Sequence, residues 1–287
     1  MTSAPDAAAP LRTRNDAVLT EMAPFVVALP QHAAMLDTRP FGLEIAAGHV
    51  FDPTRMSSER FLRRLQTLDR LTFGPAGMPM PRWVFYNCAE LPGAIFGFGR
   101  PAESLPASVR EALELSPDEA GLVPFSMYIA IPVEPPHTWV GHNLASLNPV
   151  FPNLGMKGLA SITKALGLKV FRCRTQLGAT QWSSQALHIH VRFGPLALRT
   201  AWTPAHSEPN TLTYLVHLDD EALRHACGDP SATLAYPAPT LEIAADDHGA
   251  MQELQRRVEA GERFAVVGPP RRHGQIARVP IARLPGP

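Results

Sequence analysis

The residues with the clearest capacity for chemistry are four side chains in the middle of the chain that can transfer protons. Glu134, His137 and His142 follow the apolar run SMYIAIPV, and His190 lies within ALHIHVRF. Imidazole has an ordinary pKa of about 6.5, so it can accept or donate a proton near neutral pH, and a carboxylate can accept one. Each also has a plainer interpretation, as a loop histidine making one hydrogen bond or a solvated strand end. The sequence therefore permits acid–base chemistry here without requiring it.

The expected elements around these residues are a strand, a loop, a helix and a second strand. The continuous apolar run 122–133 predicts a central strand covered on both faces. The segment 134–153 is rich in proline and glycine, which predicts an irregular loop. Helical periodicity returns over 155–167, where Gly167 is expected to end the helix, and 168–176 is interpreted as the next strand.

The preceding part of the chain predicts a strand at 42–48, a helix, a hairpin at 83–99 and a short helix at 106–115. Ser57 or Ser58 can cap the first helix. Its spacing divides the residues into a core face and a water face, namely Phe61, Leu65 and Leu68 against Arg60, Arg63, Arg64 and Asp69. The segment 24–36 is apolar but broken by a proline, and its type is left open.

The last third of the chain predicts strands at 196–202 and 211–218, followed by a separate piece from 219. That piece contains a strand at 239–245, a helix at 248–262, and two more strands, FAVVG and IARVPIARL. The expected organisation is an N-terminal arm and packing segment (1–40), a main domain (41–220) and a C-terminal appendage (221–287).

The segment 183–193 supports two interpretations. As a strand, its strict alternation puts His188 and His190 on one face, and β-branched residues favour this. As a helix, it is capped by Ser183 or Ser184 and packs through apolar residues spaced by three or four positions.

Composition excludes several classes of protein. The 287 residues carry 26 basic and 26 acidic side chains, so there is no cationic field for nucleic acid. Cys88, Cys173 and Cys227 lie far apart without CxxC spacing, which argues against a disulfide framework or a zinc ribbon and fits a reducing compartment. No apolar run reaches about 18 residues, and the N-terminus lacks the apolar core of a signal peptide. The sequence therefore predicts a cytoplasmic protein without a membrane span.

Two local patterns accompany this order of elements. The first is the run NLGMKG at 153–158, a glycine-bearing turn that opens a helix after a strand. The second is formed by Ser183, Ala186, His190 and Gly194. In its order of elements and at these positions, the chain from 42 to 218 resembles the GNAT acyltransferase superfamily, the N-acetyltransferase fold. Gly155, Ala186 and Gly194 match the family patterns, whereas Ser183 and His190 replace the family's frequent Asn and Tyr. The family order favours the helix at 183–193.

The resemblance implies an α+β fold, with a mixed, mostly antiparallel GNAT-like sheet, helices on both faces and a C-terminal α/β appendage. In the family the sheet splays at two central strands, and acyl-CoA lies in the gap with its pyrophosphate on the glycine-bearing loop. Transferred by position, the pyrophosphate would rest on the N–H groups of Leu154, Gly155, Met156, Lys157 and Gly158. A backbone N–H around Ile131 to Val133 would polarise the thioester carbonyl.

The implied reaction is direct transfer of an acyl group to an amine or a similar small nucleophile. Glu134, His137 or His142 would take the proton, and His190 would protonate the leaving thiolate. The co-substrate would be acetyl-CoA or another acyl-CoA, with an acyl carrier protein as an alternative donor. No metal is expected.

Two other functions are consistent with the same sequence. One is a non-catalytic protein of α+β fold that binds a small ligand or serves a structural role, which the imperfect motifs favour. The other is an enzyme on a β-rich fold that uses a face formed by His188 and His190, with or without a metal. A metal site would need further ligands, for which His206 and His217 are the candidates.

Overall fold

The computed structural model describes residues 11–81, 83–85, 94–134, 137–274 and 276–286. The chain divides into two compact units, and each is described by itself below. Unit 1 consists of Met1–Pro132, His142–Arg172 and Cys227–Pro230. Unit 2 consists of Val133–Gly141, Cys173–Ala226 and Ser231–Pro287.

The described strands form one mixed, mostly antiparallel sheet, so the fold is α+β, as the sequence predicts. Its 12 strands lie in the order β11-β12-β10-β7-β8-β6-β5-β4-β3-β1-β2, with β9 paired to β12. The pairs β1–β2 and β5–β6 are parallel, and the other pairs with a described register are antiparallel. A parallel pair needs a crossover connection, and the helix α6 lies in the connection between β5 and β6.

Unit 1 is built on the strands β1 to β4 and the second half of β5. Their bounds are β1 Ala23–Val27, β2 Val50–Phe51, β3 Ala94–Pro101, β4 Leu122–Glu134 and β5 Thr138–Ser146. Residues 122–130 of β4 are all buried. This confirms the prediction of a central strand covered on both faces, because only apolar or small side chains can face two packed layers.

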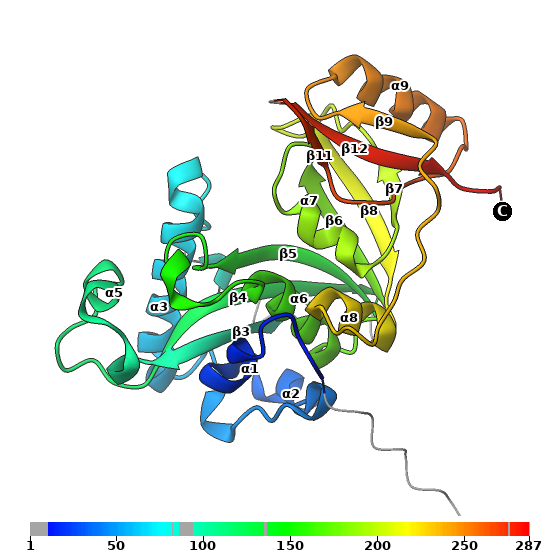
Figure 1. Ribbon diagram of the computed structural model, residues 1–287. Coiled ribbons are helices and arrows are strands. Elements are labelled where there is room, and N and C mark those ends of the chain that lie inside the picture. The colour runs from blue at the N-terminus through cyan, green and yellow to red at the C-terminus, as the bar shows by residue number, and fades with distance from the viewer. Residues whose placement is uncertain (1–10, 82, 86–93, 135–136, 275, 287) are drawn as a thin grey trace, which may run out of the picture. The chain divides into compact units, whose positions relative to one another are not determined.

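Five helices of unit 1 have described bounds: α1 Ala17–Glu21, α2 Pro30–Ala33, α3 Glu59–Phe73, α5 Ala107–Ala112 and α6 Leu159–Val170. Figure 1 shows α6 against β3 and β4. In α3 the predicted core positions Phe61, Leu65 and Leu68 are buried, which confirms its apolar face. The predicted water face holds for Arg60 and Arg63. It is wrong for Arg64, whose side chain is 9% exposed and pairs with Glu119, and for Asp69, which is only 2% exposed.

Unit 2 contains the strands β6 Thr175–Gln181, β7 Leu196–Thr200 and β8 Thr211–His217, and the short helix α7 Leu187–His190 followed by the 3-10 turn Val191–Phe193. The last segment forms α8 Asp220–Cys227, β9 Leu241–Ala244, α9 His248–Glu259, β10 Phe264–Val266, β11 Arg271–His273 and β12 Ile276–Arg283. These bounds confirm the helix at 183–193 and the strands at 196–202 and 211–218. They also confirm the four elements predicted after 238. The strand β10 pairs with β7, so the last segment extends the sheet.

Several predicted elements are wrong. Residues 42–48 contain no strand, and the strand here is β2 at Val50–Phe51. Residues 83–85 are helical and not part of a hairpin, while residues 86–93 of the predicted hairpin lie outside the described residues. The expected loop 134–153 contains β5, whose half-exposed alternation lies between prolines that suggested a loop.

The helix predicted at 155–167 begins and ends later than expected, which also displaces the strand predicted at 168–176. Gly167 lies inside α6, where a Cβ would be 3.0 Å from Tyr128 Cδ1, so glycine permits close packing of the helix on the sheet. The helix continues to Val170, and Arg172 takes a left-handed conformation with φ of 54°. The strand β6 therefore begins only at Thr175.

Candidate anion-binding loop and the adjoining strand

The loop 147–158 joins β5 to α6 and contains two glycines in the left-handed region. Gly155 has φ of 68° and Gly158, the residue that precedes α6, has φ of 89°. Other residues rarely adopt these angles, because a Cβ would crowd the following carbonyl oxygen. Between them the side chain of Met156 is fully buried and fixes the turn to unit 1.

Side chains from two other segments hold the carbonyl groups of this turn. Asn15 Nδ2 donates to the oxygens of Gly155, at 2.6 Å, and Lys157, at 3.1 Å. Arg100 Nη2 donates to the oxygen of Leu154, at 3.3 Å, and forms an ion pair with Glu21 at 2.9 Å. Three carbonyl groups of the turn are therefore oriented by the N-terminal segment and by β3.

The orientation of these carbonyls also sets the direction of the N–H groups. In a trans peptide the C=O and the N–H of the next residue point in opposite directions. With the oxygens of residues 154, 155 and 157 directed toward Asn15 and Arg100, the N–H groups of Gly155, Met156 and Gly158 point away from them. Successive N–H groups in a turn of this kind form a concave set of donors.

Six N–H groups of this turn and the first turn of α6 have no acceptor within the described part of the chain. They belong to Gly155, Met156, Lys157, Gly158, Ala160 and Ser161. The partial positive charge of a helix N-terminus adds to these donors, and the exposed ammonium of Lys157 adds a full charge nearby. Phosphate and carboxylate groups are the ligands that such an arrangement binds.

The strand before this loop has one edge with few strand partners. The register of β5 with β6 covers Thr138–Val140 and Thr175–Leu177, although β5 runs on to Ser146. Along 142–146 the backbone groups on that edge have no strand partner among the described residues. They are therefore able to bond an extended ligand, as an added strand would.

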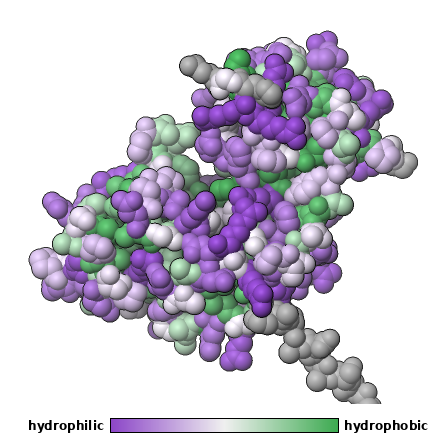
Figure 2. Space-filling view, in the orientation of Figure 1, coloured by the Kyte–Doolittle hydropathy of each residue, from purple (hydrophilic) through white to green (hydrophobic). Residues whose placement is uncertain are grey.

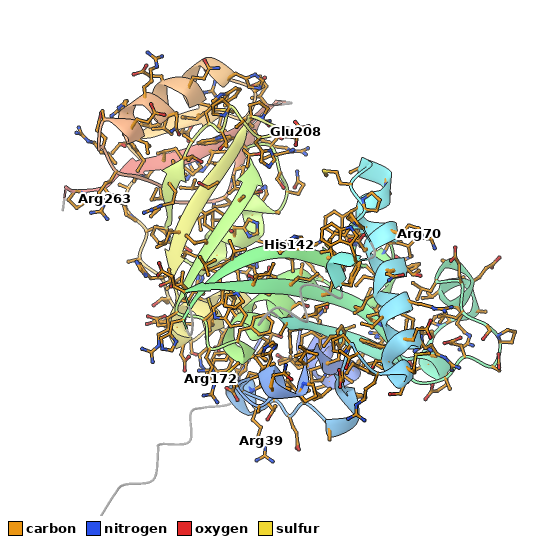
Figure 3. The ribbon with its side chains drawn as sticks, turned by 180° about the vertical axis from the view of Figure 1, so that it is seen from behind. Arg39, Arg70, His142, Arg172, Glu208 and Arg263 are labelled. Carbon is orange, nitrogen blue, oxygen red and sulfur yellow. The ribbon has the colours of Figure 1, made fainter. Side chains whose placement is uncertain are left out.

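The adjacent residues His142 and Asn143 lie on opposite faces of β5, because side chains alternate along a strand. His142, labelled in Figure 3, is exposed, and desolvation by the surrounding protein lowers the pKa of its imidazole. A lowered pKa keeps the ring neutral at physiological pH, which is the form that accepts a proton.

Asn143 contacts a buried carboxylate on α3. Its Nδ2 lies 3.5 Å from Asp69 Oδ1, while Asp69 Oδ2 accepts the N–H of Met80 at 2.6 Å. Burial raises the pKa of Asp69, against the opposing effect of these two donors. The oxygen Asn143 Oδ1 is buried and has no hydrogen-bond partner among the described residues.

The structure places four of the predicted site residues on β4 and in the turn after it. Ile131, Val133 and Glu134 belong to β4, and His137 is exposed at the start of the following strand. The oxygen of His137 accepts the N–H groups of Arg174 and Thr175, which binds the turn to β6. The strand beside β6 is thus β5, not β4. The backbone donor expected near Ile131 to Val133 therefore lies on a strand that β5 separates from β6.

The predicted residues Leu154, Gly155, Met156, Lys157, Gly158 and His142 all belong to unit 1, in β5 or in the loop that follows it. His190 belongs to unit 2, where it is 9% exposed and its ring centroid lies 5.5 Å from that of Tyr214. Its role as a proton donor stays a prediction.

The alternative based on His188 and His190 has a different setting from the one expected. Both lie in α7 rather than on one face of a strand. Desolvation lowers the pKa of His188, and the charges of Arg192 and Arg272 lower it further. Figure 2 shows polar surface over the nearby hairpin of β11 and β12.

The two further histidines proposed as metal ligands have other partners. His206 accepts the N–H of Glu208, and His217 forms a hydrogen bond with Thr175. In the described ranges, no three His, Cys, Asp or Glu side chains gather where a metal ion could bind.

Three residues of this region have no signal in the sequence. Asn15 lies in the predicted N-terminal arm, Asp69 on the predicted water face of its helix, and Asn143 in the predicted loop 134–153. Their contacts join residues that are 140 and 74 positions apart in the sequence. Local periodicity does not encode contacts over such separations.

Comparison with known proteins adds no relative: no family model and no curated protein matches this chain. None of the helices within the described ranges combines the length and the hydropathy that crossing a membrane requires.

Proposed function

We propose that this protein is an acyl-CoA-dependent acyltransferase with a GNAT-like fold. The observation that supports the proposal most is the turn at 155–158, where N–H groups without acceptors open the helix between two parallel strands. An acyl-CoA presents a pyrophosphate, the kind of anion that such a turn binds.

The strand order gives independent support. From β1 through β3, β4, β5, β6, β8 and β7, the sheet has one parallel pair, β5–β6, at its centre. The resemblance leads us to expect two central strands that part from each other, and the described β5–β6 register is only three residue pairs long. The same order includes α6 after the glycine-bearing loop and the short helix α7 after β6.

In this proposal, residues of unit 1 hold the donor. The N–H groups of Gly155, Met156 and Gly158 bind the pyrophosphate, and Lys157 adds positive charge. Backbone groups of 142–146 bond the amide groups of the pantetheine arm, and an N–H of this strand polarises the thioester carbonyl. Because a thioester is already reactive, positioning supplies much of the rate.

The chemical step is attack of a neutral amine on the thioester carbon. A C–N bond forms, the C–S bond breaks, one proton leaves the amine nitrogen and one proton reaches the thiolate. His142 takes the amine proton, directly or through water, because it is neutral at physiological pH and lies on the same strand.

A non-catalytic protein that binds an acyl-CoA or a related anion is the second candidate. It is favoured by the substitution of His190 for the family's frequent Tyr, since this residue is mostly buried.

The release of free thiol from acetyl-CoA in the presence of a panel of small amines tests the first candidate against the second. We expect release that depends on the amine and falls at least tenfold in the variant His142→Ala. The control is His49→Ala, which removes a half-buried histidine of unit 1 in the 3-10 turn Ala47–His49. Binding of acetyl-CoA without thiol release for any amine would exclude transfer to amines and leave the binding protein.

A further inference from the structure

Unit 2 has one sheet face that no described helix covers over β6 and β8. Leu177, Leu215 and Ala197 share this face in register and are each partly exposed. The opposite face packs on α7, where Tyr214 meets His190. Figure 3 shows the strands of unit 2 from the uncovered side, with α9 at the far end.

A hollow of about 660 Å³ lies where this face meets the end of α9 and the start of β10. Its apolar lining includes Leu215, Val258, Phe264 and Leu284. Small-molecule sites have volumes of roughly 300–1,000 Å³ and combine apolar walls with a few polar groups. The hollow is thus large enough for a ligand of ordinary size.

The rim of the hollow carries two arginines and a histidine from different elements. Arg199 comes from β7, Arg263 from the residue before β10, and His217 from the end of β8. Among the described residues, Arg263, labelled in Figure 3, donates only to the oxygen of Pro285, at 3.4 Å. Arg199 forms no ion pair or hydrogen bond with any described residue.

A β-bulge determines the position of Arg199. The register of β7 with β8 shifts between Leu198 and Thr200, so Arg199 is the additional residue. Bulges redirect a side chain and are frequent beside functional sites. The sheet therefore directs an unneutralised guanidinium over an apolar surface.

The one acidic side chain of the lining does not neutralise this rim. Glu262 accepts two hydrogen bonds from Arg257, at 3.0 and 2.8 Å, and lies 3.2 Å from Arg283. Its charge is therefore balanced by two arginines outside the lining. The hollow keeps a net positive charge from Arg199 and Arg263.

We infer that this hollow is a second ligand site, for a small oxyanion carried on an apolar body. The oxyanion, a carboxylate or a phosphate monoester, pairs with Arg199 and Arg263, whose planar guanidinium groups bind two oxygens at once. The apolar body packs against Leu215, Val258, Phe264 and Leu284. The site is separate from the turn at 155–158 and does not depend on the proposed transfer reaction.

Calorimetric titration of the full chain with four eight-carbon probes tests this inference: octanoate, octyl phosphate, octylamine and octanol. We expect the two anions to bind at least tenfold more tightly than octylamine and octanol, and the tighter anion identifies the natural head group. Equal binding of octanoate and octylamine, or no binding of either anion at millimolar concentration, would overturn the inference.

Three variants locate the site. Arg199→Gln and Arg263→Gln are each expected to weaken binding of the tighter anion at least tenfold. Arg256→Gln removes the same charge from an exposed site on α9, where the side chain pairs with Glu253, and is expected to change the affinity less than twofold. Unchanged affinity in Arg199→Gln would contradict the site. Melting temperatures without ligand establish that each variant is folded.

Discussion

At the scale of single residues, the environment of Asp69 gives the most direct prediction. This carboxylate is 2% exposed on α3 and accepts hydrogen bonds from Met80 N–H and, at 3.5 Å, from Asn143. Desolvation outweighs both donors and raises its pKa above the ordinary value of 3.8. The folded state therefore retains this proton to a higher pH than the unfolded state does.

A group with a raised carboxyl pKa lowers the free energy of unfolding as pH rises through the interval between its unfolded and folded pKa values, because the native state binds more protons there. The variant Asp69→Asn lacks this contribution. We expect its melting temperature, relative to that of the natural protein, to rise as pH increases from about 4 to 7. The measurement is the melting temperature of both proteins across this range.

Asp52 supplies a control of opposite sign. Hydrogen bonds from Thr54 lower the pKa of Asp52, so its contribution to stability is present above the ordinary carboxyl pKa and is lost in acid. The melting temperature of Asp52→Asn, relative to that of the natural protein, should therefore fall as pH rises from about 2 to 5, which extends the same measurement into acid. A difference for Asp69→Asn that is constant with pH would contradict the assignment.

At the scale of elements, the turn at 155–158 depends on a residue that is distant in sequence. Asn15 fixes two carbonyl groups of the turn and contributes no donor to a ligand on the other side. We expect Asn15→Ala to lower the free energy of unfolding by about 1 kcal/mol and to weaken acetyl-CoA binding severalfold. Chemical denaturation and calorimetry measure the two effects.

The matched control for Asn15 is Thr20→Ala in α1, which removes a hydroxyl that bonds only within its own helix. Acetyl-CoA affinity equal to that of the natural protein is expected for this variant. If Asn15→Ala also binds acetyl-CoA with natural affinity, the orientation of these carbonyl groups does not determine the direction of the N–H groups in the turn.

Gly167 tests the packing of α6 on the sheet. Alanine there gains roughly 1 kcal/mol of helix propensity, but its Cβ would lie 3.0 Å from Tyr128 Cδ1 and 3.4 Å from Phe96. Overpacking costs about 1–3 kcal/mol, so we expect a net loss of stability in urea denaturation. Gly249→Ala in α9 meets only Asp247 Oδ1, at 3.5 Å, and should not destabilise. Greater stability of Gly167→Ala would show that the layer is loosely packed.

These elements also show what local pattern can and cannot predict. Long runs with a clear apolar pattern, such as α3, β4 and α9, are recognisable because each of the two helices buries one continuous face and β4 buries both of its faces. The strand β5 was missed because its alternation is short, mixes polar with apolar residues and lies between prolines. Gly167 suggested a helix end, yet the absent side chain serves packing between layers, which is a tertiary constraint.

The candidate site was predictable to a similar degree. Gly155 and Gly158 marked the loop, because left-handed conformations favour glycine. The prediction placed β4 beside the strand that follows the helix, whereas the structure places β5 there. The sequence does not say which strand pairs with β6. The contacts of Asn15 and Asp69 arise only when distant segments come together.

At the scale of the whole molecule, the proposed function requires that acyl-CoA binds this protein and that its pyrophosphate contacts the turn at 155–158. A glutamate at Gly155 would put a carboxylate among the N–H groups and repel a pyrophosphate. Gly77 is a matched position in unit 1, since it has a similar φ of 70°, and a Cβ there also meets no atom within 4 Å. Both substitutions introduce the same charge and similar backbone strain.

The decisive measurement is the thermal stability of the natural protein, Gly155→Glu and Gly77→Glu, each with and without millimolar acetyl-CoA. At about a hundred times its dissociation constant, a ligand adds roughly 2.7 kcal/mol to the stability of the folded state. We predict this stabilisation for the natural protein and for Gly77→Glu, and its loss in Gly155→Glu. Equal stabilisation of the two variants, or none in the natural protein, would contradict an acyl-CoA site at this turn.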